Sequence, residues 1–152
     1  MKVLLTGADG LLGSNLVRVL LQRGHSVRVL LWVNSSSRTL EGLEIEKHYG
    51  DVLSPETLDP AVKDCDAVIH AAAMTNIWPQ RSEKLRRVNI EGTRNMIDTV
   101  LRNRIVRMIY VGSASSVNAQ GNGDGSGSFP GARFGLDYID SKYEALNLVL
   151  EA

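Results

Sequence analysis

The chain has 152 residues, about the length of one domain, and 43% of them are hydrophobic, enough for a buried core. Its 17 Lys and Arg residues balance 17 Asp and Glu residues, so the net charge gives no sign of a nucleic-acid or membrane partner. The single cysteine, Cys65, excludes an internal disulfide and fits a reducing compartment. No apolar run approaches the roughly 20 residues of a membrane-spanning helix, so we expect a cytoplasmic protein.

The first half of the chain alternates short apolar runs with longer segments of helical periodicity. Residues 2–6 predict a strand, and apolar residues at helical spacing then predict a helix that ends at Gly24. Residues 26–31 predict the second strand and residues 43–49 the third. Ser, Pro and Glu at 54–56 are typical of a helix start, with proline in the first turn.

The second half continues the same alternation. Residues 67–70 predict a fourth strand, residues 80–103 a long helix and residues 105–111 a fifth strand, and a last helix begins near Leu136. Strands joined by crossover helices imply a parallel sheet covered on both faces, and right-handed crossovers favour the strand order 3-2-1-4-5. We therefore expect an α/β fold, a doubly wound parallel sheet of the Rossmann type, as one domain over residues 1–152.

Three glycines follow the first predicted strand and open the first helix. Gly7, Gly10 and Gly13 belong to the run TGADGLLG. At such a turn, unpaired backbone N–H groups and the positive end of the helix dipole attract an anion. Glycine permits the tight turn and lets a pyrophosphate approach the backbone. The pattern is weak evidence alone, and its place between strand and helix strengthens it.

A tyrosine and a lysine lie four residues apart in the last predicted helix. Tyr138 and Lys142 therefore share one helix face. A free tyrosine, with an ordinary pKa near 10, is a poor base at neutral pH, and a nearby ammonium group favours the phenolate. Tyr138 is thus a candidate general acid or base for a carbonyl–alcohol pair. By itself the spacing is common, and a half-buried tyrosine beside a solvated lysine is the simpler interpretation.

A hydroxyl-rich segment at the end of the fifth strand supports the catalytic interpretation. It reads Gly-Ser-Ala-Ser-Ser at residues 112–116. In doubly wound sheets, ligands bind beyond the carboxyl ends of the strands. A serine there could donate a hydrogen bond to a substrate oxygen and hold it against the tyrosine. The alternative is that these serines cap a turn.

Together these motifs resemble the short-chain dehydrogenase/reductase superfamily. The run TGADGLLG, GD at 50–51, HAAA at 70–73, VNIEGT at 88–93, YVGSAS at 110–115 and YIDSK at 138–142 occur in the order of its extended branch. That branch includes nucleotide-sugar epimerases and dehydratases, dihydroflavonol reductases and 3β-hydroxysteroid dehydrogenases. The resemblance covers nearly the whole chain and does not identify a substrate.

The resemblance implies roles for individual residues. It assigns Tyr138, Lys142 and Ser113 to catalysis, with Ser115 as the second candidate for the serine. It implies that Asp51 binds the adenine amino group and that Asn89 and His70 have structural roles. The residues expected to contact the cofactor are Gly7, Gly10, Leu11, Leu12, Gly13, Arg38, Asp51, Val52, Ala71, Ala72, Ala73 and Lys142.

The choice of nicotinamide cofactor depends on the end of the second strand. NAD-preferring proteins usually place an acidic residue there, and residues 30–34 contain no carboxylate. Arg38, after three serines, could instead bind a 2′-phosphate. We therefore expect NADP, with NAD as the alternative. No His, Cys and carboxylate cluster has the spacing of a metal site.

The resemblance also implies what this chain does not contain. Members of the extended branch continue past the Tyr-x-x-x-Lys helix with further strands and a small substrate domain, which this sequence lacks. We therefore expect a truncated chain or a shortened relative that associates with another copy as a homo-oligomer. The glycine-rich segment at residues 121–128 is interpreted as an active-site loop rather than a linker.

The sequence therefore predicts an NAD(P)-dependent oxidoreductase that transfers a hydride between its cofactor and a small-molecule carbonyl or alcohol. A dihydroflavonol-reductase-like carbonyl reductase is the first choice, because residues 110–118 read YVGSASSVN. A nucleotide-sugar epimerase or dehydratase is the second. A non-catalytic dinucleotide-binding module is the alternative from another class.

Overall fold

A computed structural model of the chain describes residues 1–116 and 134–152. The glycine-rich segment at 121–128 lies outside the described residues. The chain divides into two compact units. The first comprises Met1–Ala72 and Asn95–Val111, and the second comprises Ala73–Arg94 and the described part of Gly112–Ala152.

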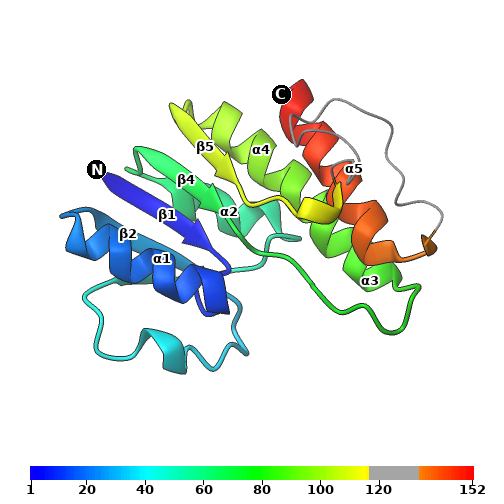
Figure 1. Ribbon diagram of the computed structural model, residues 1–152. Coiled ribbons are helices and arrows are strands. Elements are labelled where there is room, and N and C mark those ends of the chain that lie inside the picture. Colours follow the sequence, from blue (N-terminus) through cyan, green and yellow to red (C-terminus); the bar gives the residue numbers. More distant parts are fainter. Residues whose placement is uncertain (117–133) are drawn as a thin grey trace. The chain divides into compact units, whose positions relative to one another are not determined.

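The first unit contains a five-stranded parallel sheet (Figure 1). Its strands are β1 (Lys2–Thr6), β2 (Ser26–Leu31), β3 (Glu46–Tyr49), β4 (Ala67–His70) and β5 (Arg107–Tyr110). They lie in the order β3-β2-β1-β4-β5, which confirms the predicted topology. In the centre of the sheet Leu5 of β1 pairs with Val29 of β2 and Ile69 of β4.

Helices cover both faces of this sheet. Helix α1 (Leu11–Gln22) lies on one face, and α2 (Pro55–Val62) and α4 (Gly92–Arg102) lie on the other (Figure 1). On the α1 face a buried apolar cluster takes alternate residues of the strands, as the two-residue period of a strand requires. Its buried members are Val3, Leu5, Ala8, Val17, Val27, Val29, Leu31, Leu40 and Ile69.

Strands β3 and β5 begin later than predicted, because the apolar residues predicted to begin them form other backbone hydrogen bonds. Leu43 and Ile45 pack against the core, but the N–H of Ile45 donates to Leu43 O at 3.0 Å, so the ladder begins at Glu46. Before β5, Arg104 is left-handed at φ 55°, and the N–H of Ile105 donates to Val100 O at 3.0 Å. These residues therefore complete the end of α4 instead of extending the strand.

The long helix predicted over 80–103 is three segments. It begins at α3 (Glu83–Arg86), because the Ser82 hydroxyl caps the helix by accepting the N–H of Leu85 at 3.3 Å. A wider π-helical turn, η2 (Arg87–Glu91), then leads into α4. At this turn the Thr93 hydroxyl donates to the carbonyl of Asn89 at 2.7 Å, the bond by which a threonine satisfies a carbonyl four residues earlier in a helix.

A buried arginine joins β2 to α2 within the first unit. Arg28 is 7% exposed and donates to the carbonyls of Ala61 and Lys63 at 2.8 and 2.7 Å. It also pairs with Glu46 at 2.8 Å. These bonds offset the cost of burying the guanidinium charge of Arg28.

The second unit consists of α3, η2, a short 3₁₀ turn η3 (Ala114–Ser116) and α5 (Asp137–Glu151). Helix α5 packs against α3, η2 and η3. It begins where the sequence predicts, after Leu136 at the N-cap.

Candidate functional site

The glycine turn joins β1 to α1, as predicted, and close packing explains two of its glycines. Gly7 has φ +67°, and a Cβ atom there would lie 2.7 Å from the backbone of Ala71 and Ala72. A Cβ atom on Gly13 would lie 2.1 Å from Gly7 O. At Gly10 the nearest atom would be 3.4 Å away, so packing does not require glycine there.

The first residues of α1 face solvent above this turn. Gly10 is the N-cap, and Leu11 and Leu12 are 87% and 51% exposed. The first N–H groups of a helix have no partner within the helix, and the helix dipole adds positive potential there. The turn thus has the exposed donors and the close backbone packing that a pyrophosphate group needs.

A buried hydrogen-bond network holds the end of β4 beside the glycine turn. The Thr6 hydroxyl accepts the N–H of Ala72 at 3.0 Å and lies 2.8 Å from His70 Nδ1. His70 is 1% exposed, and its ring centroid lies 6.1 Å from that of Tyr110. His70 therefore has the contacts of a structural residue, as expected.

The other predicted cofactor residues of the first unit lie outside its strands and α-helices. Asp51 Oδ1 accepts the N–H of Leu53 at 2.9 Å, and Val52 is buried with its carbonyl bonded to Asn95 at 2.9 Å. Arg38 is exposed at the start of η1 (Arg38–Leu40). Ala71 and Ala72 belong to the first unit, whereas Ala73 belongs to the second.

The three predicted catalytic residues all lie in the second unit. The Tyr138 hydroxyl lies 3.5 Å from Ser113 Oγ, the outer limit of a hydrogen bond. Ser113 Oγ also lies 2.8 Å from Ser115 Oγ and accepts the N–H of Ser115 at 3.3 Å. Ser113 is therefore the serine that contacts the phenol, and Ser115 contacts Ser113.

Lys142 lies one helical turn after Tyr138 in α5 and is 4% exposed. Burial lowers the pKa of Lys142 to about 8. A lysine with this pKa is mostly an ammonium ion at neutral pH, and it loses its proton more readily than a solvated lysine. It is thus a buried positive charge on the helix face that carries the phenol.

Asn89 connects three segments of the second unit. Its amide donates to Met74 O at 3.0 Å and to Ser141 Oγ at 3.0 Å, and it accepts the N–H of Met74 at 2.8 Å. Ser141 in turn donates to the carbonyl of Tyr138 at 3.0 Å. Asn89 therefore joins the segment that follows β4 to α5, the helix that carries Tyr138, in keeping with its expected structural role.

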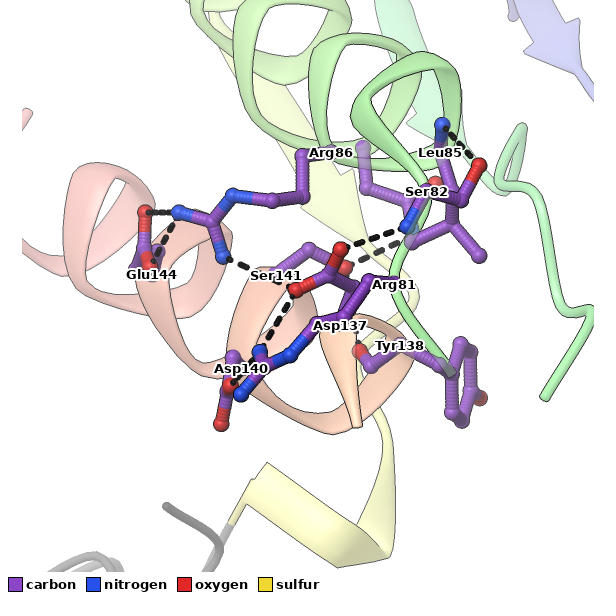
Figure 2. A network of polar contacts seen from close by, with 10 residues as sticks. Arg81, Ser82, Leu85, Arg86, Asp137, Tyr138, Asp140, Ser141 and Glu144 are labelled. Atoms are coloured by element: carbon purple, nitrogen blue, oxygen red, sulfur yellow. Dashed lines mark hydrogen bonds and ion pairs between the residues drawn. The ribbon is translucent and has the colours of Figure 1, made fainter. Parts of the chain in front are cut away.

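A second polar network, around Asp137, could not be predicted from local sequence (Figure 2). Its carboxylate accepts the N–H of Ser82 at 2.6 Å and pairs with Arg81 at 2.8 Å. Burial alone would raise the pKa of Asp137, but the hydrogen bonds from Arg81 and Ser82 outweigh it and lower that pKa. Arg86 adds an ion pair with Glu144 at 2.7 Å. The first turn of α5, which holds Tyr138, is thus anchored by charge-assisted hydrogen bonds.

Within residues 1–116 and 134–152, no group of three His, Cys, Asp or Glu side chains could hold a metal ion. No helix in the same residues is both long and apolar enough to span a bilayer.

Comparison with known proteins identifies the family. Residues 4–152 match the model of the 3-beta hydroxysteroid dehydrogenase/isomerase family. A Synechocystis protein provisionally named dihydroflavonol 4-reductase is 34% identical over 97% of this chain. The match covers 43% of that relative, so the chain spans less than half the length of this curated relative.

Solved structures agree with the fold. The crystal structure of gox2253 is 32% identical, with a TM-score of 0.85 over 99% of this chain and 46% of its own. The Bordetella bronchiseptica enzyme WbmG, solved with NAD and UDP, is 20% identical, with a TM-score of 0.82 over 100% of this chain and 50% of its own. The chain therefore belongs to the 3-beta hydroxysteroid dehydrogenase/isomerase family, in the extended branch of the short-chain dehydrogenases/reductases.

Proposed function

We propose that this chain is the dinucleotide-binding and proton-transferring part of an NAD(P)-dependent oxidoreductase that reduces a carbonyl or oxidises an alcohol. The observation that carries the proposal is the contact of the Tyr138 hydroxyl with Ser113 Oγ at 3.5 Å. The buried Lys142 on the same helix and the names of the relatives support it. The proposal includes a small-molecule substrate, a cytoplasmic location and a single Rossmann domain.

The glycine turn fits the diphosphate of the cofactor. The N–H groups at the start of α1 would bind the phosphates, and Asp51 and Val52 would contact the adenine. Ala71, Ala72 and Ala73, with small side chains, would line the path of the ribose and nicotinamide. When bound, a nicotinamide dinucleotide supplies or accepts the hydride. WbmG, which has the same fold, was solved with NAD.

Tyr138 is the residue proposed to exchange a proton with the substrate oxygen. In the reducing direction its hydroxyl would donate a proton to the substrate oxygen, and in the oxidising direction its oxygen would accept one. The hydroxyl of Ser113 would donate a hydrogen bond to the same substrate oxygen, because it lies beside the phenol. The ammonium of Lys142 would stabilise the negative charge that the phenol oxygen bears after it has donated the proton. The 3.5 Å contact would shorten once a substrate oxygen joins it, as catalytic hydrogen bonds commonly do.

Two measurements test the proposal. NADH and NADPH are titrated into the chain while nicotinamide fluorescence is followed, and turnover is measured with a panel of aldehydes and ketones. Tyr138→Phe should bind the dinucleotide as the wild type does and lose at least about 100-fold in kcat. Tyr49→Phe is the matched control, since Tyr49 is an exposed tyrosine of β3. Unchanged turnover in Tyr138→Phe would remove the catalytic assignment.

A dinucleotide-binding module without catalysis is the second candidate. The observation in its favour is that the Tyr138 hydroxyl lies 3.5 Å from Ser113 Oγ, the outer limit of a hydrogen bond. Saturable dinucleotide binding with no turnover of any carbonyl substrate would support the module.

A further inference from the structure

A carboxylate within the glycine turn contacts the loop that follows β2. The Ser35 hydroxyl donates to Asp9 Oδ2 at 2.5 Å, and the Thr39 hydroxyl donates to the Asp9 carbonyl at 3.0 Å. These residues belong to the first unit, and the contacts join segments 26 and 30 residues apart. Asp9 therefore connects the turn proposed to bind the diphosphate to the loop that follows β2.

The position of this carboxylate matters because β2 ends without one. In dinucleotide-binding sheets, an acidic side chain after this strand usually accepts hydrogen bonds from the adenosine ribose. Here Leu31 is followed by Trp32, Val33 and Asn34. Asp9 brings a carboxylate to the same loop from the glycine turn, through its contact with Ser35.

Asp9 also retains capacity to accept further hydrogen bonds. The residue is only half-buried, and its Oδ1 has no hydrogen bond or ion pair within residues 1–116 and 134–152. A carboxylate can accept several hydrogen bonds, so the bond to Ser35 leaves room for a hydroxyl donor.

Arg38 lies in the same loop, and its positive charge would favour the 2′-phosphate of NADP. It follows Ser37, whose N–H donates to Ser35 Oγ at 3.3 Å, and it precedes Thr39. Arg38 is exposed, so it must give up side-chain freedom to hold a 2′-phosphate, and such exposed pairs contribute little. A carboxylate already fixed beside a phosphate opposes it by direct charge repulsion, which is the larger effect. The balance at this loop therefore disfavours a phosphate.

We infer that Asp9 is a cofactor-selecting residue, which accepts hydrogen bonds from the ribose hydroxyls of NAD and disfavours the 2′-phosphate of NADP. The inference rests on the proposed dinucleotide-binding function. It differs from the NADP preference expected from Arg38, because the sequence alone did not place the carboxylate of Asp9 at this loop.

The test compares Asp9→Asn with the wild type by titration of NADH and NADPH, followed by nicotinamide fluorescence. Asparagine keeps the size of the side chain and an oxygen for Ser35, and it removes the charge. The wild type should bind NADH about tenfold or more tightly than NADPH, and the variant should reduce this ratio at least about fivefold, mainly by binding NADPH more tightly. Asp98→Asn, an exposed residue of α4, makes the same change in net charge and should leave the ratio unaltered.

The outcomes separate this inference from the function on which it rests. A wild type that prefers NADPH, or a ratio that is the same in Asp9→Asn and the wild type, would overturn the inference and leave the dinucleotide function standing. An equal change in Asp98→Asn would also overturn it, because net charge alone would then explain the effect. Failure to bind either dinucleotide would overturn both.

Discussion

Asp137 directly precedes Tyr138, and its carboxylate accepts the backbone N–H of Ser82 at 2.6 Å. The backbone N–H of Asp137 donates in return to Gln80 O at 2.9 Å. Two opposed hydrogen bonds therefore join the first turn of α5 to the segment that precedes α3. A helix fixed at its first turn has a fixed rotation about its axis, so this pair also fixes the direction of Tyr138.

The Asp137→Ala variant should lose about 1–3 kcal/mol of unfolding free energy, because the N–H of Ser82 loses its acceptor and Arg81 its partner. It should also lower kcat more than it changes KM. Asp140→Ala is the matched control, since Asp140 contacts Arg81 at 3.4 Å, and it should change stability by less than about 1 kcal/mol. Urea denaturation and steady-state kinetics measure both effects, and equal losses in the two variants would contradict the prediction.

Two glycines of the turn should respond differently to alanine. In Gly13→Ala the new Cβ would lie 2.1 Å from Gly7 O, so we expect a loss of about 2 kcal/mol or more in stability. In Gly10→Ala the nearest atom is 3.4 Å away and the backbone is extended, so stability should change by less than about 1 kcal/mol. Its dinucleotide affinity should still fall, because the methyl group obstructs the approach of the pyrophosphate. Thermal melts and fluorescence titration distinguish the two, and a stable Gly13→Ala protein would refute the close packing.

The serine that assists the phenol can be identified by two substitutions. Ser113→Ala should reduce kcat by about 10- to 100-fold, since it removes the hydroxyl next to Tyr138. Ser115→Ala should reduce kcat less than about fivefold, because Ser115 contacts Ser113 instead of the phenol. The larger effect at Ser115 would show that the assignment of the two hydroxyls must be exchanged.

Lys142 should give the protein a measurable dependence of stability on pH. Burial lowers its pKa from 10.5 to about 8, so between these values the unfolded chain binds more protons than the folded chain. The contribution of Lys142 to the unfolding free energy therefore rises with pH across this window. Relative to Lys142→Met, the wild type should gain roughly 1–3 kcal/mol from pH 8 to pH 10.5. Urea denaturation at several pH values measures the difference, and a constant difference would be evidence against a buried ammonium.

Local patterns predicted most of the architecture. Strands β1, β2 and β4 begin and end where apolar runs and turn residues indicate, and the sheet has the expected order. The glycine turn and the Tyr138–Lys142 spacing were also visible, because each depends on a few neighbouring residues. The errors are local too: β3 and β5 begin later than predicted, since backbone bonds at Ile45 and Ile105 compete with the ladder.

By itself, the sequence determined the order of strands and helices, the glycine turn between β1 and α1, and the helix face with the phenol and the lysine. These features follow from periods of two and 3.6 residues and from backbone preferences of single residues. The tertiary structure alone decided which side chains support them. Asp9 meets Ser35 across 26 residues, Asn89 meets Ser141 across 52, and Asp137 meets Ser82 across 55. No local period encodes such pairs, because they form only when packing brings distant segments together.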